Sequence, residues 1–274
     1  MPTREQKIEI PVPSGPIEGT LVTPGSLIPG VLFVHGWGGS QQQYLARARE
    51  IAALGCVCLT FDLTGHAGTQ PQRETVSRES NLRDVLAAYD VLARHPHVDP
   101  SAVAVVGSSY GGYLAAILTT MRRVKWLALR APALYIDSGW ELPKLQLHKE
   151  QDLRSYRRST VPADQNRALR ACAEFRGDVL IIESERDDVI PHAVVTSYRE
   201  ACVQAGSLTY RCIEGADHGL TDDVGQLAYT TRLTQWLAEM LPGARREGVS
   251  GAAAIAAAGQ AAVAEQAPQS LKAS

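Results

Sequence analysis

The stretch VAVVGSSYGGYLAAIL, residues 103–118, contains a sharp change of backbone direction between two different patterns. Its first residues form an apolar, β-branched run typical of a buried strand, and the residues after Tyr110 are typical of a helix. Ser108 and Ser109 lie between the two, with glycines on either side. Glycines at such a turn allow neighbouring backbone segments to approach closely. The stretch therefore predicts a strand, a tight turn and a helix in direct succession.

On both sides of this stretch, strand patterns and helix patterns follow one another along most of the chain. Strands are predicted at 7–12, 17–24, 30–36, 56–62, 102–106, 124–132, 178–184 and 208–215, and helices at 80–95, 110–121, 192–205 and 225–241. From the fourth strand onward, strand and helix alternate. The strands are rich in Val, Ile and Leu on both faces, which is typical of a sheet covered by helices on both sides. The predicted fold class is therefore α/β, with a mainly parallel central sheet.

The composition is that of an ordinary globular protein. The 274 residues are 45% hydrophobic and 20% charged, with a formal net charge of −2, and they are sufficient to bury one large core. A nucleic-acid partner is not expected, because the chain lacks the basic excess that binds phosphates. The N-terminus carries charges where a signal peptide has an apolar region, and no segment approaches the roughly 18 uninterrupted apolar residues of a membrane span. We therefore expect a cytoplasmic protein with no membrane span.

Two segments depart from the alternation. Residues from about 133 to 172 separate two strands by far more than the roughly two to six residues usual for such a connection. Their charged, helical pattern predicts a small lid over the ligand end of the sheet. Residues 243–274 are Ala-rich and of low complexity, so we expect a mobile appendage after a single domain that covers residues 1–242.

One of the two serines is a candidate nucleophile. Only Ser109 has glycines two residues before and after it, Gly107 and Gly111, and so fits the pattern G-x-S-x-G. At a strand-to-helix turn this pattern holds the hydroxyl up at the carboxyl end of the sheet. The alternative is a helix N-cap serine between tight-turn glycines.

A serine hydroxyl becomes a good nucleophile only when a base removes its proton and a carboxylate orients that base. On this architecture the expected chain order is serine, acid, histidine. An acidic loop carrying Asp187 and Asp188 follows one predicted strand, and a loop carrying His218 follows the next. Loops at the carboxyl ends of neighbouring parallel strands converge in space. We therefore predict that Ser109, His218 and one of the two aspartates are neighbours.

Five segments together resemble the α/β-hydrolase family, over roughly residues 7–241. They are LFVHGWGGS at 32–40, FDLTGHAGT at 61–69, GSSYGG at 107–112, SERDDVIP at 184–191 and GADHGL at 215–220, in the order that the family has them. The chain is most similar to small carboxylesterases and to serine-aminopeptidase-like and dienelactone-hydrolase-like members. The resemblance implies an α/β-hydrolase fold and a Ser-Asp-His triad. The family pattern places its aspartate four residues before the proline of VIP, which selects Asp187 and leaves Asp188 as a solvent-facing alternative.

An acyl-transfer enzyme also needs hydrogen-bond donors for the oxyanion of the tetrahedral intermediate. The residue after the nucleophile and the loop after the third strand supply these backbone N–H groups, which gives Tyr110 and Trp37. The Trp37 ring either lines the acyl pocket or packs against its own loop. The resemblance further implies that His35 and His66 are structural rings that hydrogen-bond the loops in which they lie.

The predicted function is hydrolysis of small-molecule carboxylic esters through an acyl-enzyme, with no cofactor and no metal. An acidic or aromatic-acid ester is compatible with the seven Lys or Arg against four Asp or Glu at 141–170, although such a charge run is also typical of a solvated helix face. One alternative is a peptidase or amidase, in which Glu141, Glu150 or Asp152 would hold the substrate amine. Another is a binding protein that keeps the fold without catalysis. The sequence leaves a homo-oligomer open.

Overall fold

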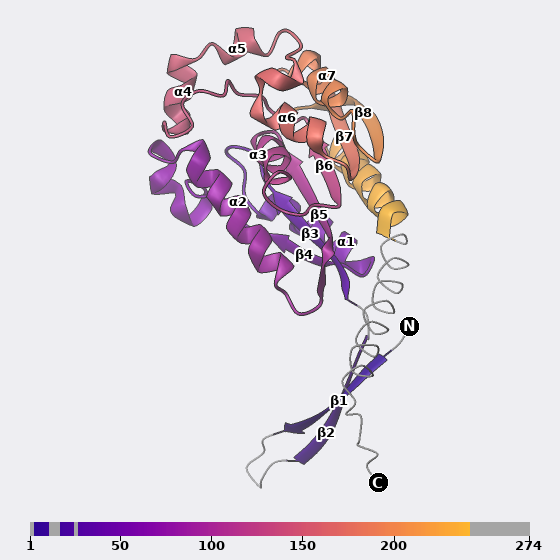
Figure 1. The fold of residues 1–274 in the computed structure, drawn as a ribbon. Coiled ribbons are helices and arrows are strands. Elements are labelled where there is room, and N and C mark those ends of the chain that lie inside the picture. The colour runs from indigo at the N-terminus through magenta and orange to yellow at the C-terminus, as the bar shows by residue number, and fades with distance from the viewer. Residues whose placement is uncertain (1–2, 11–16, 25–26, 242–274) are drawn as a thin grey trace, which may run out of the picture. The chain divides into compact units, whose positions relative to one another are not determined.

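The central sheet is parallel throughout the part of the chain that the computed structural model describes, residues 3–10, 17–24 and 27–241 (Figure 1). Its strand order is β4-β3-β5-β6-β7-β8. The strands are β3 (Ile28–Val34), β4 (Val57–Thr60), β5 (Val98–Ser108), β6 (Trp126–Arg130), β7 (Asp178–Arg186) and β8 (Ser207–Asp217). Every neighbouring pair is parallel, which confirms the predicted α/β class.

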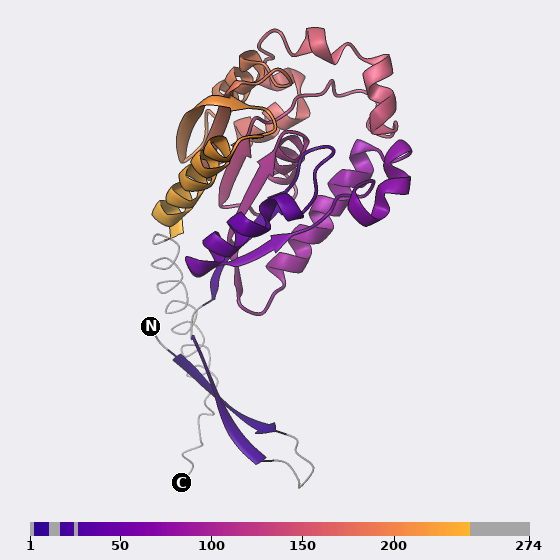
Figure 2. The same ribbon diagram turned by 180° about the vertical axis from the view of Figure 1, so that it is seen from behind.

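Helices cover both faces of this sheet (Figures 1 and 2). One layer contains α2 (Arg78–Ala93), α3 (Tyr110–Leu118), α6 (Arg167–Glu174) and α7 (His192–Ala201), each of which contacts the next. The other contains α1 (Gln42–Ala53) and a last helix over residues 223–241. Arg47 of α1 joins these two, because its Nε donates to Thr230 Oγ1 at 2.9 Å.

The long connection between β6 and β7 contains several short helices. It contains α4 (Lys144–Glu150), α5 (Leu153–Tyr156) and the short 3₁₀ turn η2 (Ala163–Gln165) before it reaches α6. The last of these helices, α6, contacts α3 and α7 and so belongs to the helix layer on the sheet. The part that stands outside this layer is therefore the segment with α4 and α5.

The strands of residues 3–10 and 17–24 belong to a different compact unit from residues 28–238, which carry the central sheet. These strands, β1 (Thr3–Ile10) and β2 (Ile17–Pro24), pair as an antiparallel hairpin, with Thr3 opposite Pro24 and Ile10 opposite Ile17. The tail predicted at 243–274 lies outside the described residues. Among the described helices, none has the length and apolar character needed to cross a bilayer.

The turn between β5 and α3 depends on glycine. α3 is buried along its whole length, and its first turn packs directly on the carboxyl end of β3. A Cβ on Gly111 would lie 2.2 Å from the carbonyl oxygen of Val34 and 2.5 Å from that of His35. A Cβ on Gly107 would lie 2.6 Å from the carbonyl oxygen of Gly111. Because these obstacles are backbone atoms, they cannot move aside as a side chain would.

We predict that Gly111→Ala lowers the free energy of unfolding by about 3 kcal/mol or more, because β3 and α3 must separate to admit the methyl group. Gly68→Ala is the matched control, since a Cβ there meets nothing within 4 Å. Urea unfolding of both variants measures the difference. Equal stabilities of the two variants would contradict the close approach.

Candidate active site

Ser109 occupies a strained backbone position at the end of β5. Its φ of 50° and ψ of −117° fall outside the regions that serine normally adopts. Three hydrogen bonds hold the turn: the Ser109 N–H donates to the Arg130 carbonyl at 2.9 Å, and the Ser109 carbonyl accepts from Tyr113 N at 3.1 Å and Ala133 N at 3.0 Å. This backbone conformation directs the Ser109 hydroxyl away from α3 and toward the carboxyl end of the sheet.

The side chains of Ser109, His218 and Asp187 form a hydrogen-bonded chain. His218 Nε2 lies 3.1 Å from Ser109 Oγ, and His218 Nδ1 lies 2.7 Å from Asp187 Oδ2. The residues come from the ends of β5, β7 and β8, separated by 109 and 31 positions along the sequence. Parallel strands that end at one edge of the sheet thus bring the three predicted residues together.

The loop around Asp187 decides between the two candidate aspartates. Asp187 Oδ1 accepts from the N–H groups of Val189 at 2.9 Å and Ile190 at 2.7 Å, and its side chain is only 3% exposed. Asp188 is exposed. Asp187 is therefore the carboxylate that contacts the imidazole.

Arg130 holds the loop that carries His218, and the sequence analysis did not single it out. It ends β6, is buried, and donates to the carbonyl oxygens of Asp217 and His218 and to Ser184 Oγ. A signal was present, because a charged residue ends the otherwise apolar run WLALR. A buried arginine at the carboxyl end of a central strand needs hydrogen-bond acceptors, and here the backbone carbonyls of the His218 loop supply them.

The segment after β3 lies against the Ser109 turn. A Cβ on Gly36 would lie 3.3 Å from Ser109 Cβ, which shows how closely the two backbones approach. Within the described residues, the backbone N–H groups of Trp37 and Tyr110 donate to no acceptor. These are the two donors that the sequence predicts for an oxyanion. They are therefore free to receive a ligand oxygen.

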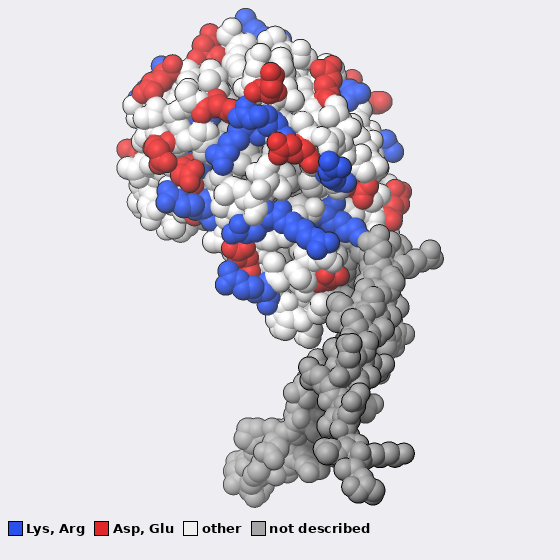
Figure 3. Space-filling view, viewed as in Figure 1, with Lys and Arg blue, Asp and Glu red and all other residues white. Residues whose placement is uncertain are grey.

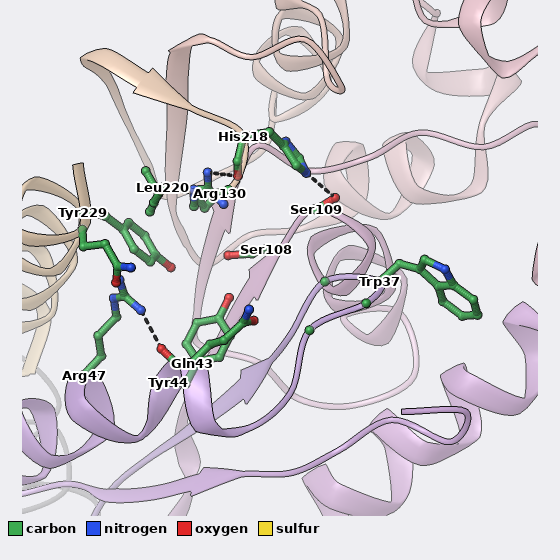
Figure 4. A pocket seen from close by; sticks show the side chains of 15 residues that line it. Trp37, Gln43, Tyr44, Arg47, Ser108, Ser109, Arg130, His218, Leu220 and Tyr229 are labelled. Atoms are coloured by element: carbon green, nitrogen blue, oxygen red, sulfur yellow. Dashed lines mark hydrogen bonds between the residues drawn. The ribbon is translucent and has the colours of Figure 1, made fainter. Parts of the chain in front are cut away.

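The Trp37 ring packs on its surroundings. Figure 4 shows the indole directed away from Ser109 and from the cavity beside it. Its centroid lies 4.7 Å from that of His66 and 5.7 Å from that of Tyr110, both in edge-to-face arrangements. Of the two alternatives for this ring, the geometry favours loop packing over an acyl pocket.

His35 and His66 hydrogen-bond the loops, as the resemblance implied. His35 Nε2 accepts from Leu63 N at 3.0 Å, and its Nδ1 lies 2.8 Å from the Gly36 carbonyl. His66 Nε2 accepts from Gly38 N at 3.0 Å. Burial lowers the pKa of His35, and burial together with the neighbouring His35 lowers the pKa of His66 to about 4. Both rings are therefore neutral acceptors at neutral pH and fix the position of the 36–38 segment.

Lys144 connects the insertion to this same segment. It begins α4, is only 1% exposed, and places Nζ 4.1 Å from the centroid of the Trp37 ring, 4.8 Å from that of Tyr110 and 5.1 Å from that of Tyr135. An ammonium surrounded by ring faces is held by cation–π attraction. Burial lowers the pKa of Lys144. The aromatic cage thus anchors α4 to the candidate oxyanion segment.

A cavity of about 250 Å³ opens beside Ser109 and His218 (Figure 4). Its walls come from the 36–39 segment, α1, the carboxyl ends of β5 and β6, the His218 loop and the last helix. The Ser108 side chain extends into it, on the side of the strand opposite to the Trp37 ring (Figure 4). The cavity therefore starts at the candidate nucleophile and continues between α1 and the last helix.

Comparison with known proteins gives a match to the family model described as "Alpha/beta hydrolase family", over residues 31–228. Among curated proteins, the quorum-quenching protein AidA of Acinetobacter baumannii is 34% identical over 87 residues, which are 31% of this chain and 28% of AidA. The mitochondrial palmitoyl-protein thioesterase ABHD10 of Pongo abelii is 30% identical over 112 residues, 40% of this chain and 35% of that protein. The chain thus matches only about a third of the length of these relatives.

Among solved structures, one described as LipS and LipT, two metagenome-derived lipolytic enzymes, superposes with a TM-score of 0.61 at 19% identity. The match covers 78% of this chain and 95% of the other. At that identity the similarity establishes the fold.

We predict that the His66 ring makes stability fall in mild acid. Because its folded-state pKa lies near 4 and its unfolded-state pKa near 6.5, the unfolded chain binds the extra proton between these values. Stability is full above about pH 6.5 and is lost as the pH falls toward 4. His66→Gln keeps an acceptor for Gly38 N but does not titrate. Between pH 7 and pH 5, urea unfolding should show the wild type losing about 1–2 kcal/mol relative to this variant; parallel pH profiles would refute the assignment.

Proposed function

Because the chain belongs to the alpha/beta hydrolase family, we propose that it is a serine hydrolase that cleaves carboxylic esters, with Ser109 as its nucleophile. The observation that carries this proposal is the chain of contacts from Ser109 Oγ through His218 to Asp187. A hydroxyl, an imidazole and a carboxylate in this geometry are the parts that acyl transfer requires.

In the proposed acylation step, Ser109 Oγ attacks the ester carbonyl carbon while His218 Nε2 accepts the hydroxyl proton. Asp187 accepts a hydrogen bond from Nδ1 and stabilises the imidazolium that forms. The tetrahedral intermediate collapses, the bond to the alcohol oxygen breaks, and His218 returns the proton to the departing alcohol. Water then attacks the acyl-serine, again with His218 as the base, and releases the acid.

The proposed oxyanion donors are the N–H groups of Trp37 and Tyr110. Both are unengaged, and the Gly36 contact holds one segment against the other. Because the donors belong to the backbone, they are already in place before charge develops on the substrate oxygen. One such donor is worth about 3 kcal/mol of activation free energy.

The lid role of the insertion is also a proposal, and Lys144 supports it. Its cage includes the rings of the two residues that supply the oxyanion donors. The segment with α4 is therefore fastened at the candidate site and stands outside the helix layer, as a cover over the site would.

The carboxylates of the insertion support an ester over a substrate with a free amine. Glu150 Oε1 accepts from Gln146 Nε2 at 2.5 Å, within its own helix. Asp152 caps α5 by accepting from Ser155 N at 2.9 Å. The residues that line the cavity beside Ser109 include no Asp or Glu. A peptidase that anchors a substrate ammonium needs a carboxylate there, so we place peptidase activity second.

We predict that the protein hydrolyses p-nitrophenyl esters faster than aminoacyl p-nitroanilides, because the proposed site has no carboxylate for an amine. Ser109→Ala should lose on the order of 10⁴-fold in kcat/KM for the ester. Release of p-nitrophenol or p-nitroaniline measures both. Faster anilide turnover would indicate a peptidase, and no turnover over a broad ester and thioester panel would indicate a binding protein.

Labelling with a fluorophosphonate provides the control for this experiment. Peptide mapping should locate the adduct on Ser109. An adduct on the adjacent Ser108 would refute the assignment of the nucleophile even if esters are cleaved.

Two neighbouring aspartates offer a matched pair of variants. We predict that Asp187→Asn lowers kcat about 10³–10⁴-fold, because the amide no longer stabilises the imidazolium or fixes its tautomer. Asp188→Asn, at an exposed position one residue away, should change kcat by less than about twofold. Steady-state kinetics on one ester compares the two, and similar losses in both would point to a general effect on the loop.

A further inference from the structure

The cavity beside Ser109 contains two buried guanidinium groups. Arg47 comes from α1 and Arg130 from the end of β6, and the residues are 7% and 6% exposed. Figure 4 shows them on different sides of the same space, with Ser108 and Tyr229 near its centre. Two cations that line one small cavity repel each other, and an anion bound between them would offset that repulsion.

Neutral groups accept the hydrogen bonds of both guanidiniums. Arg47 donates to Thr230 Oγ1 at 2.9 Å, to the Gln43 carbonyl at 2.7 Å and to Gln226 Oε1 at 3.0 Å. Arg130, as described above, bonds one hydroxyl and two carbonyl oxygens. Over residues 27–241, no carboxylate lies within 4.0 Å of either guanidinium.

The Asp217 carboxylate interacts electrostatically with Arg130, but its side-chain hydrogen bonds go to Thr221. Its carboxylate accepts from Thr221 Oγ1 at 2.5 Å and Thr221 N at 3.0 Å, outside the set of cavity-lining residues. These bonds are the main cause of its lowered pKa. By contrast, on the outer surface seen in Figure 3, Lys and Arg side chains lie among Asp and Glu. The cavity differs from that surface, because its lining residues include two arginines and no Asp or Glu.

Three buried polar atoms of cavity-lining residues make no hydrogen bond of full geometry within the described part of the chain, although Ser108 lies within reach of the Tyr44 and Tyr229 hydroxyls. The three atoms are Ser108 Oγ, Tyr229 Oη and Arg130 Nε. Burial raises the pKa of Tyr229 and of its neighbour Tyr44, so both hydroxyls keep their protons and remain donors. Buried polar atoms are almost always bonded in folded proteins. The two guanidiniums lie over the Tyr229 ring and have no carboxylate paired with them in the described residues. Together with these incompletely bonded donors, they point to an acceptor with negative charge.

We propose that this cavity is a subsite for a carboxylate on the acyl group of the substrate. Arg47 and Arg130 supply the charge, and Ser108 and Tyr229 donate hydrogen bonds. The inference rests on the proposed function, since it places the ester carbonyl at Ser109 and the free carboxylate deeper in the cavity. A volume of about 250 Å³ is below the range of drug-sized ligand pockets. The substrate class is therefore the monoester of a short dicarboxylic acid.

The kinetic test compares mono-p-nitrophenyl glutarate with the same ester after methylation of its free carboxylate. The wild type should favour the carboxylate ester in kcat/KM by at least about tenfold, the scale of one charge-assisted hydrogen bond. Arg47→Gln should reduce this preference about tenfold or more. Tyr229→Phe, which removes one hydroxyl and keeps the ring, should reduce it several-fold and serves if the first variant does not fold.

Arg49→Gln is the matched control, because Arg49 lies on the same helix but is exposed. This variant should keep the wild-type preference. A wild-type preference near one, or a preference that survives both Arg47→Gln and Tyr229→Phe, would overturn the subsite.

Binding measured without turnover separates this inference from the proposed function. Glutarate should bind Ser109→Ala in calorimetry and raise its Tm, and the added Arg47→Gln change should abolish both effects. If neither ester is cleaved but glutarate binds in this way, the esterase proposal fails and the subsite stands. If esters are cleaved but glutarate does not bind, the subsite alone fails. Equal stabilisation by inorganic phosphate would show a general anion site and overturn the assignment to a substrate carboxylate.

Discussion

The contact between the first turn of α3 and the carboxyl end of β3 is the constraint on which the rest of the site depends. It brings two backbones so close that position 111 has no room for a side chain. The same contact sets the segment after β3 against the Ser109 turn, and it does so through main-chain atoms. The relative position of the candidate nucleophile and the candidate oxyanion donors therefore depends little on side-chain identity.

Hydrogen bonds on both sides of the site add to this constraint. His35 and His66 fix the 36–38 segment from the side of β4, and Arg130 fixes the histidine loop from the end of β6. Each of these residues is buried and acts on backbone groups. The site is thus built from loops, but buried side chains hydrogen-bond those loops at several points. These bonds hold the loop residues in fixed positions relative to the sheet.

Much of this arrangement follows from sequence patterns. Strand and helix periodicity predicts the parallel sheet, and the order of the five segments brings residues 109, 187 and 218 to one edge. These predictions succeed because they rest on local pattern and on the rule that parallel strands end at the same edge. Packing between distant elements is harder to foresee. The bond from Arg47 to the last helix and the burial of Lys144 have no local signature, because each depends on which helix faces cover the sheet. Arg130 has one, the charge that ends the apolar run WLALR, but the run does not reveal which groups Arg130 bonds.

The cage around Lys144 has a consequence for how such an enzyme diversifies. Insertions of this kind are the variable parts of a scaffold, and altering them is an obvious route to new substrate preferences. Here the insertion and the backbone of the candidate oxyanion donors share one set of ring contacts, because the Lys144 ammonium of α4 lies over the rings of Trp37 and Tyr110. An exchanged insertion that lacks a cation at this point would remove the ammonium that Trp37, Tyr110 and Tyr135 share. Evolution and protein engineering alike would then have to replace the insertion and its anchoring residue together.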